Sequence, residues 1–250
     1  MPGHHGLFHQ FTVAAGVLTR LPLGAGVTED GAVAAASWAF PLVGAGIGAL
    51  CALAYFVSEL VGLPDPPSGL LAVLAGIAIT GAFHEDGLAD TADGFGGGHD
   101  REQKLAIMRD SRHGTFGILA LVLSVALRAA ALAAIGDPIH AGFALIAAHA
   151  ASRGALPPLM RLLPPARADG LAAAVGQPSR TAAIVAAVIA AVALALLGPL
   201  TGTVAIGLTV LALAFAAALA QRQIGGYTGD VLGCFQQIGE IVMLLVAAAR

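Results

Sequence analysis

Charged side chains are scarce in this chain of 250 residues. They make up 11% of it, against roughly 25% in soluble globular domains, and 58% of the residues are hydrophobic. A water-soluble domain is therefore excluded, and we expect an all-α protein that crosses the lipid bilayer several times. The net charge of −3 and the lack of any block rich in lysine or arginine exclude nucleic acid as a partner.

Cysteines and processing signals are also sparse. The two cysteines, Cys51 and Cys234, lie far apart in the chain, so the sequence supports neither a disulfide framework nor a zinc site. Residues 1–10 lack a basic stretch before an apolar core and have no evident cleavage site, so no removable signal peptide is expected. No internal repeat of the kind found in many transporters is visible.

Apolar runs separated by polar or proline-rich segments predict a bundle of about six to seven transmembrane helices in a single domain, 1–250. Residues 1–30 are expected to form an N-terminal interfacial segment, because Arg20 and Pro22 interrupt its apolar run. The residues Thr28, Glu29 and Asp30 are candidates to cap the first span. The expected spans are 33–60, 70–83, 118–135, 139–152, 181–197, 201–219 and a final helix that ends near Ala249. The span 70–83 is complete only if its helix continues into the acidic residues that follow.

Two glycine and proline patterns bear on this arrangement. The spacing of Gly44 and Gly48 favours a close helix contact, and small residues on several helix faces permit homo-oligomeric packing. The segment 63–69, with three prolines, is expected to be a short loop.

Basic residues are distributed unevenly among the connecting segments. The segments near 61–69, 136–138 and 198–200 contain neither lysine nor arginine, whereas 84–116 and 153–180 hold four each and 220–237 holds Arg222. Cytoplasmic loops carry an excess of these residues. We therefore expect 84–116, 153–180 and 220–237 to lie together on the cytoplasmic side as the functional loops.

An acidic motif follows directly on the run 70–83. Asp86, Asp90 and Asp93 would share an arc about 60° wide if this segment is helical. A divalent cation relieves the repulsion among such carboxylates, and Mg²⁺ prefers oxygen ligands of this kind. The sequence therefore predicts a Mg²⁺ site here, and the alternative is an acidic helix end exposed to solvent. Asp230 and Glu240 form a second acidic pair; Glu240, beside an apolar run, has to be paired, protonated or bound to an ion.

Basic groups near this motif predict phosphate binding. Arg109 and Arg112 precede the start of an apolar helix, and guanidinium groups beside a helix N-terminus bind phosphate well. Arg153 directly follows a span and is a further candidate; the alternative for all three is the ordinary basic flank of a cytoplasmic helix end. His84 is a candidate base or substrate contact, and neighbouring carboxylates are expected to favour its protonated form, although a packed polar side chain is the alternative.

Three separated motifs resemble those of the cobalamin synthase family, the adenosylcobinamide-GDP ribazoletransferases. They are His84-x-Asp86-Gly87-Leu88-Ala89-Asp90-Thr91-Ala92-Asp93-Gly94, Met108-Arg109-Asp110-Ser111-Arg112-x-Gly114, and Gly229-Asp230-x-Leu232-Gly233 leading to Glu240. The segment 18–22, which contains Arg20, also fits that family. The resemblance runs from about residue 10 to the C-terminus.

The resemblance implies a Mg²⁺-dependent, multi-pass enzyme of the bacterial inner membrane. Such an enzyme would join adenosylcobinamide-GDP to α-ribazole or its 5′-phosphate and release GMP. It would bind Mg²⁺ through Asp86, Asp90 and Asp93, helped by Asp230 or Glu240. Phosphate contacts would come from Arg20, Arg109, Arg112 and Arg153, and the base would be His84 or one of the carboxylates.

Two other functions share parts of this pattern. A CDP-alcohol phosphotransferase also uses a metal and an Asp-Gly-rich helix, but its signature requires Ala-Arg where this chain has Ala89 and Asp90. A cation transporter would place its carboxylates near the bilayer midplane on broken helices. Here the acidic cluster lies at the end of a span.

Overall fold

The structure is a computed structural model, and it describes residues 6–23, 31–170 and 175–249. The expected cap at Thr28, Glu29 and Asp30 lies outside this part of the chain. An isolated parallel bridge between Pro165 and Tyr227 is the only pairing of extended backbone among the described residues, and no strand occurs in them. The all-α prediction is therefore confirmed.

The helices follow one another with short connections. They are α1 (Leu7–Leu18), α2 (Ala32–Ala36), a 3₁₀ turn (Ser37–Ala39), α3 (Phe40–Leu60), α4 (Asp65–Thr80), α5 (Phe83–Gly97), α6 (Arg101–Ile107), α7 (Thr115–Ile135), α8 (Pro138–Gly154), α9 (Leu156–Leu162), α11 (Arg180–Leu194), a second 3₁₀ turn (Ala195–Leu197), α12 (Pro199–Ile224) and α13 (Gly229–Ala248). The expected loop 63–69 is wrong from residue 65 onward, because α4 begins at Asp65 with prolines in its first turn, where proline is well tolerated.

Five helical segments of the described chain are long and apolar enough to cross a membrane. They are Ala32–Leu60, Thr115–Ile135, Arg180–Leu197, Pro199–Ile224 and Gly229–Ala248, and the bent pair α4 and α5 makes a sixth if it is counted as one span. The polytopic architecture is confirmed, whereas a seventh span is not found within the described ranges. The expected span 139–152 corresponds to α8, which has 17 residues and ends with polar side chains.

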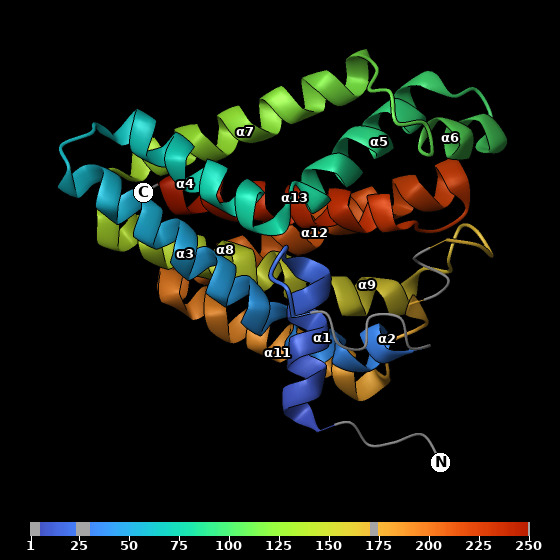
Figure 1. Cartoon of the computed structure of the whole chain (residues 1–250), viewed down its shortest axis with the longest axis horizontal. Helices are drawn as coiled ribbons and strands as arrows, with labels where there is room; N and C mark the ends of the chain where they lie inside the picture. Colours follow the sequence, from blue (N-terminus) through green and yellow to red (C-terminus); the bar gives the residue numbers. More distant parts are fainter. Residues whose placement is uncertain (1–5, 24–30, 171–174, 250) are drawn as a thin grey trace.

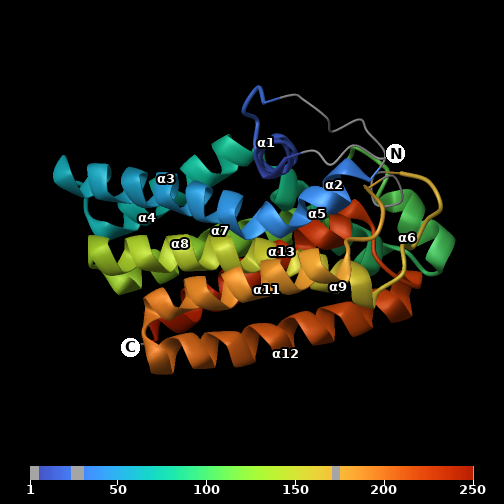
Figure 2. The same ribbon diagram turned by 90° about the horizontal axis from the view of Figure 1, so that it is seen from below.

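α8 lies in the interior of the bundle, where it packs against α3, α11 and α13. Figure 2 shows α3 and α4 along one side, α12 along the opposite side, and α8 and α13 between them. The predicted glycine contact is confirmed. A Cβ atom at Gly44 would lie 2.2 Å from the His149 carbonyl oxygen, and one at Gly48 would lie 2.6 Å from the Leu145 carbonyl oxygen. Only glycine lets α3 and α8 approach this closely.

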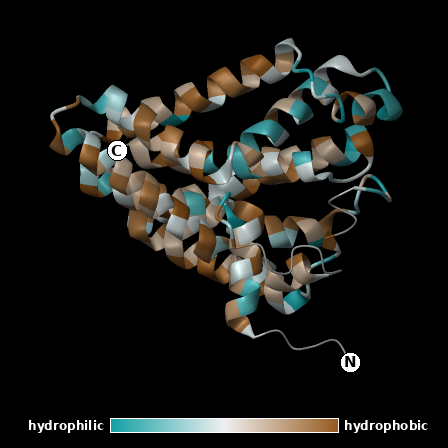
Figure 3. Cartoon of the chain, viewed as in Figure 1, coloured by the Kyte–Doolittle hydropathy of each residue, from teal (hydrophilic) through white to brown (hydrophobic). Residues whose placement is uncertain are grey.

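Large apolar side chains cover the outside of the bundle. Leu211 and Phe215 on α12 are 67% and 72% exposed, and Val122 on α7 is 60% exposed. Figure 3 shows apolar residues along the long helices and hydrophilic ones gathered around α6 and the outer part of α5. An apolar surface of this extent is suited to contact with lipid.

The basic connections meet at one end of the bundle (Figure 1). Arg101 Nε donates to the Ile224 carbonyl oxygen at 2.9 Å, its guanidinium also bonds the Ala166 carbonyl oxygen, and Tyr227 N donates to the Pro164 carbonyl oxygen at 3.0 Å. These bonds tie together the three segments that carry the loop arginines. The three segments therefore lie together at one end of the bundle, and the side of the membrane that this end faces stays a prediction.

Candidate active site

A sharp turn between α4 and α5 sets the direction of the acidic helix α5. Gly81 and Ala82 both have left-handed backbone conformations, with φ of +67° and +59°, and α5 leaves α4 at an angle of 92°. The helix of 70–83 therefore does not continue straight into the acidic motif. A Cβ atom at Gly81 would lie 2.1 Å from Arg20 Nε, so a larger residue there would displace the flexible Arg20 side chain. Arg20 is exposed, and its backbone N–H donates to the Ile79 carbonyl oxygen at 2.8 Å, which places this predicted phosphate ligand over the turn.

Asp93 connects α5 to α7. Its carboxylate accepts hydrogen bonds from the backbone N–H groups of Gly114 (2.6 Å) and Gly117 (2.8 Å) at the start of α7. A carboxylate is well placed there, because the first N–H groups of a helix lack partners within the helix and carry a partial positive charge. Asp93 is 7% exposed. The structure thus places this predicted metal ligand at a helix–helix contact.

Glu85 connects the other end of α5 to the same helix. Arg128 Nη2 of α7 lies 3.0 Å from Glu85 Oε1, and Arg128 Nη1 lies 3.0 Å from Glu240 Oε1 of α13. All three side chains are buried. Gln237 Nε2 donates to Glu85 Oε1 at 3.2 Å. The rotation of α5 about its axis is therefore fixed at both ends, by Glu85 and by Asp93.

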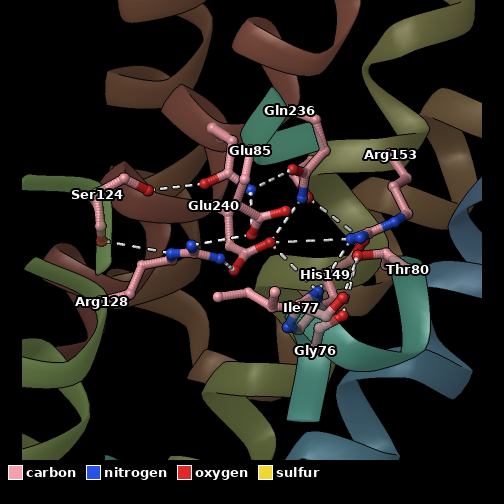
Figure 4. Close-up of polar contacts among 12 residues, drawn as sticks. Gly76, Ile77, Thr80, Glu85, Ser124, Arg128, His149, Arg153, Gln236 and Glu240 are labelled. Carbon is pink, nitrogen blue, oxygen red and sulfur yellow. Dashed lines mark hydrogen bonds and ion pairs between the residues drawn. The ribbon is translucent and has the colours of Figure 1, made fainter. Parts of the chain in front are cut away.

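The pair of Arg128 and Glu240 belongs to a larger polar network in the bundle interior (Figure 4). Glu240 Oε2 accepts from Gln236 Nε2 at 2.6 Å and lies 3.2 Å from His149 Nδ1. Arg153 Nη1 is 2.9 Å from His149 Nδ1 and 3.9 Å from Glu240 Oε2. Two arginines and two glutamates balance in charge, which is how charged groups persist in the interior of a membrane protein. Of the three alternatives expected for Glu240, namely pairing, protonation or a bound ion, the structure shows pairing.

Two predicted ligands are therefore separated from the acidic motif. Arg153 is 1% exposed and Glu240 is 2% exposed, and both belong to this interior network. A bound phosphate would need an accessible guanidinium group, and a shared cation would need carboxylates that converge. The structure brings Arg153 and Glu240 together with each other, but not with Asp86 and Asp90.

Asp86, Asp90 and Asp230 do come together, where α5 crosses the start of α13. A Cβ atom at Gly87 would lie 2.6 Å from the Asp230 carbonyl oxygen, so the two helices touch there. The charges of Asp86 and Asp230 lie close enough to repel that of Asp90, and His113 Nδ1 is 4.0 Å from Asp90 Oδ1. As the side chains lie, no three His, Cys, Asp or Glu residues in the described ranges are arranged as a metal site.

Arg167 lies beside this carboxylate cluster. Its Nη2 atom is 3.3 Å from Asp230 Oδ2, which also accepts from Thr228 Oγ1 at 3.1 Å. Arg167 also lines a recess of about 690 Å³ together with Arg101, Arg109 and Asp169. The sequence motifs did not single out Arg167. The sequence signal that could have identified Arg167 was its position in one of the arginine-bearing loops, two residues before Asp169.

Arg109 and Arg112, two of the four arginines predicted to hold phosphate, line different recesses beside α6. Arg109 Nη2 is 2.7 Å from Asp169 Oδ2 in the first recess. Arg112 bonds Asp110 at 2.6 Å and lines a second recess, of about 800 Å³, with His113 at the start of α7. The Arg112 guanidinium lowers the pKa of Asp110 to about 2. Both arginines are exposed, so a phosphate can reach them, although they do not share one recess.

His84 is buried in α5, and its surroundings differ from the prediction. It is 1% exposed, and neither ring nitrogen has a hydrogen-bond partner among the described residues. The expectation that nearby carboxylates favour its protonated form is wrong, because a buried imidazolium without a partner loses its hydration and gains no bond in return. The neutral ring lines a cavity whose other side chains are apolar.

Comparison with known proteins identifies the same family as the sequence motifs that meet in this site. The family model described as cobalamin-5-phosphate synthase matches residues 10–248. A protein of Bradyrhizobium diazoefficiens named adenosylcobinamide-GDP ribazoletransferase is 53% identical over 95% of this chain and 92% of its own length. Proteins with the same name from Mesorhizobium japonicum and Azorhizobium caulinodans are 50% and 48% identical, over 92% and 91% of this chain and 89% and 90% of their own lengths.

No solved structure is significantly similar to this chain. The family therefore rests on the sequence matches, which extend from α1 to α13 and include every motif that contributes to the α5–α13 crossing. The chain belongs to the cobalamin-5-phosphate synthase family.

Proposed function

We propose that this chain joins adenosylcobinamide-GDP to α-ribazole, or to its 5′-phosphate, and releases GMP in a late step of cobalamin synthesis. The name shared by relatives that are 48% to 53% identical supports this activity. The structural observation that carries the proposal is the meeting of Asp86, Asp90 and Asp230 beside Arg167. Carboxylates for a cation next to a guanidinium for phosphate are the groups that phosphoryl transfer requires.

In the proposed reaction a ribose hydroxyl oxygen of ribazole bonds to the phosphorus next to the cobinamide. The bond from that phosphorus to the oxygen of the GMP moiety breaks, and the hydroxyl proton passes to a carboxylate or to solvent. Asp86 is exposed and can receive this proton, whereas His84 is enclosed. We therefore favour a carboxylate over His84 as the base.

We propose that the residues at the α5–α13 crossing hold Mg²⁺. Asp86, Asp90 and Asp230 offer hard oxygen donors, and Mg²⁺ is commonly held by a few carboxylates together with water and substrate phosphates. The mutual repulsion of the three carboxylates is opposed among the described residues by Arg167 beside Asp230 and by His113 beside Asp90. When bound, the ion would neutralise charge on the transferred phosphoryl group and on the leaving phosphate. We leave Asp93 and Glu240 out of the metal set, because their oxygens already bond neighbouring helices.

The exposed Arg109 and Arg112 and the half-buried Arg167 then bind the diphosphate. Arg167 and Arg109 line the recess beside Asp230, and Arg112 lies at the start of α7 on the other side of α6. In both places a carboxylate, Asp169 or Asp110, pairs with the arginine, and a phosphate would replace it. Guanidinium groups bind phosphate through paired N–H donors.

We place the protein in the bacterial cytoplasmic membrane, in contact with lipid along its apolar helices. Its arginine-bearing end faces the cytoplasm, because cytoplasmic loops carry the excess of lysine and arginine. Homo-oligomeric packing stays a prediction, based on the small residues on several helix faces.

The experiment that tests this function measures GMP release by the purified protein in liposomes. We expect release only when adenosylcobinamide-GDP, a ribazole substrate and Mg²⁺ are all present, and none after chelation. A folded protein that releases no GMP under these conditions would contradict the proposal. Cation flux in the same liposomes would instead support a transporter that uses the buried charges of α7 and α13.

A further inference from the structure

A long apolar groove lies on the outside of the bundle between α11 and α12 (Figure 2). Its volume is about 1010 Å³, and residues of α8, α9 and α13 also line it. Thr209 is the only polar residue among the described ones in its walls, and the hydroxyl oxygen of Thr209 is buried. The other walls are small or aliphatic side chains, among them Ala155, Ala187, Ala191, Ala214 and Met243. The groove therefore suits an apolar occupant.

The two ends of the groove differ. Beside the turn that joins α11 to α12, a Cβ atom at Gly202 would lie 2.6 Å from the Leu194 carbonyl oxygen, so the two helices touch and close the groove there. Leu162 and Leu163 line the opposite end, where Leu162 is 78% exposed. A chain-like molecule in the groove therefore has its tip at the α11–α12 turn and its head at the end of the bundle that carries the basic connections.

The dimensions of the groove match a single lipid chain. The part of α12 that lines it, from Ile206 to Ala217, is about 17 Å long at 1.5 Å per residue. One leaflet supplies half of a hydrocarbon core of about 30 Å, which is about 15 Å. Volume divided by length gives a cross-section of about 60 Å², less than the roughly 80 Å² of an α-helix 10 Å across. A fatty acyl chain therefore fits within the groove, whereas a helix of a second copy does not.

Arg161 lies at the open end of the groove. It follows Pro158 by about one helical turn and directly precedes Leu162, and both of these residues line the groove. Its exposed guanidinium donates from Nη1 to the Pro178 carbonyl oxygen at 2.6 Å, and no carboxylate of the described chain pairs with it. The remaining N–H donors are suited to a phosphate. A positive charge without a carboxylate partner favours a lipid of net negative charge over a zwitterionic one.

We propose that this groove binds one acyl chain of an anionic phospholipid, and that Arg161 binds the phosphate of that lipid. The site differs from general contact with the bilayer because it holds one lipid in a fixed place. The inference goes beyond the proposed transfer reaction and does not depend on it. The proposed orientation of the chain serves only to place the lipid in the cytoplasmic leaflet.

The test places a fluorescent reporter at the groove. Trp38 is the one tryptophan of the chain, so Trp38→Phe provides a background without tryptophan fluorescence. In this background, Val210→Trp puts the reporter on the rim of the groove. Leu211→Trp is the matched control, because Leu211 lies at the same depth but about 100° further around α12 and does not line the groove. Both positions are more than half exposed, at 62% and 67%, so each has room for the larger ring.

Quenching by lipids with brominated acyl chains measures contact with the reporter. The full-length variants are placed in phosphatidylcholine vesicles that contain rising fractions of brominated phosphatidylglycerol or brominated phosphatidylcholine. At Val210→Trp, half-maximal quenching should require about fivefold less of the anionic lipid, the factor that one arginine beside a lipid phosphate contributes. At Leu211→Trp the two lipids should quench equally.

Three further variants separate the contributions of the head and the chain. Arg161→Gln should abolish the preference at Val210→Trp. Arg222→Gln should keep it, because Arg222 is an exposed arginine about three turns after Leu211 on the same face of α12, away from the groove. Ala191→Phe should fill the groove and weaken quenching of Val210→Trp by both lipids, which tests the site even if Arg161→Gln does not fold.

Two results would overturn the lipid site. Equal quenching of Val210→Trp by the two lipids, or a preference that survives in Arg161→Gln, would leave only general bilayer contact. No quenching of Val210→Trp, combined with a dimer in light scattering, would assign the groove to a second copy of the chain. GMP release does not enter the readout, so a protein that binds the lipid and releases no GMP would contradict the proposed function and support the groove.

Discussion

Arg128 and Glu240 are 112 residues apart in the chain, yet their side chains meet at 3.0 Å inside the bundle. The same guanidinium reaches Glu85, so one arginine of α7 holds both α13 and the acidic helix α5. This contact fixes how α5 presents Asp86 and Asp90, although Arg128 itself is 2% exposed and out of reach of a substrate.

Replacing Arg128 with methionine should destabilise the protein strongly. The substitution leaves Glu85 and Glu240 buried without their charged partner, and breaking a buried ion pair in this way costs about 3–5 kcal/mol. Thermal unfolding in detergent measures the effect. Arg222→Met, which changes an exposed arginine in the last turn of α12, is the control and should unfold as the wild type does. Equal unfolding temperatures for the two variants would show that the network does not hold the bundle together.

Asp86 and Asp93 should respond differently to the same change. Asp93→Ala removes the acceptor of two backbone N–H groups and should lower the free energy of unfolding by about 1–3 kcal/mol. Asp86 is exposed and lies among like charges, so Asp86→Ala should change stability by less than about 0.5 kcal/mol while abolishing GMP release. Unfolding curves and GMP release are measured on both variants. A stable Asp93→Ala protein would contradict the anchoring role given to that carboxylate.

Gly117 tests how closely α5 and α7 approach each other. A Cβ atom there would lie 2.3 Å from Asp93 Oδ2 and 3.0 Å from the Ala89 carbonyl oxygen, so Gly117→Ala has to push the helices apart and should destabilise the protein. A Cβ atom at Gly207 in α12 would meet no atom of the described residues within 4 Å, and Gly207→Ala should stabilise by about 0.5–1 kcal/mol through its helix propensity. The two unfolding temperatures should therefore move in opposite directions; a shift of both in the same direction would argue against the close contact.

Arg167 should contribute to substrate binding. Arg167→Gln removes the guanidinium beside Asp230, and we expect the KM for adenosylcobinamide-GDP to rise about tenfold, because a hydrogen bond to a charged group is worth about 1.5–3 kcal/mol. The KM for ribazole should change little. Steady-state GMP release measures both constants, with the exposed arginine variant Arg180→Gln as the control. An unchanged KM for adenosylcobinamide-GDP would remove Arg167 from the phosphate site.

Composition and patterning predicted much of the fold. The apolar runs, the helical acidic motif and the gathering of basic loops follow from hydropathy and charge, which act locally along the chain. The turn at Gly81 and Ala82 does not follow from them, because alanine rarely adopts the left-handed conformation that Ala82 has here. The sequence therefore placed the acidic motif correctly but left its direction open.

The candidate site was predicted only in part, because the sequence does not show which neighbouring helix each carboxylate contacts. Asp86, Asp90 and Asp93 share one arc of a helix, and only the contact with α7 distinguishes Asp93, because its oxygens bond the start of that helix. Arg128 was visible as a charge inside an apolar run, and so was Glu240. Since such charges have to be paired in a membrane interior, matching the two would have identified the network from the sequence.

The most direct measurement is GMP release by Asp90→Asn in liposomes, beside the wild type and with both substrates and Mg²⁺ present. Asparagine keeps the size of the side chain and removes the charge that a cation needs. We predict release at the level of the protein-free control, with an unfolding temperature no lower than that of the wild type, because repulsion by Asp86 and Asp230 disappears. Substantial GMP release by the folded variant would contradict the assignment of this carboxylate cluster as the site of transfer.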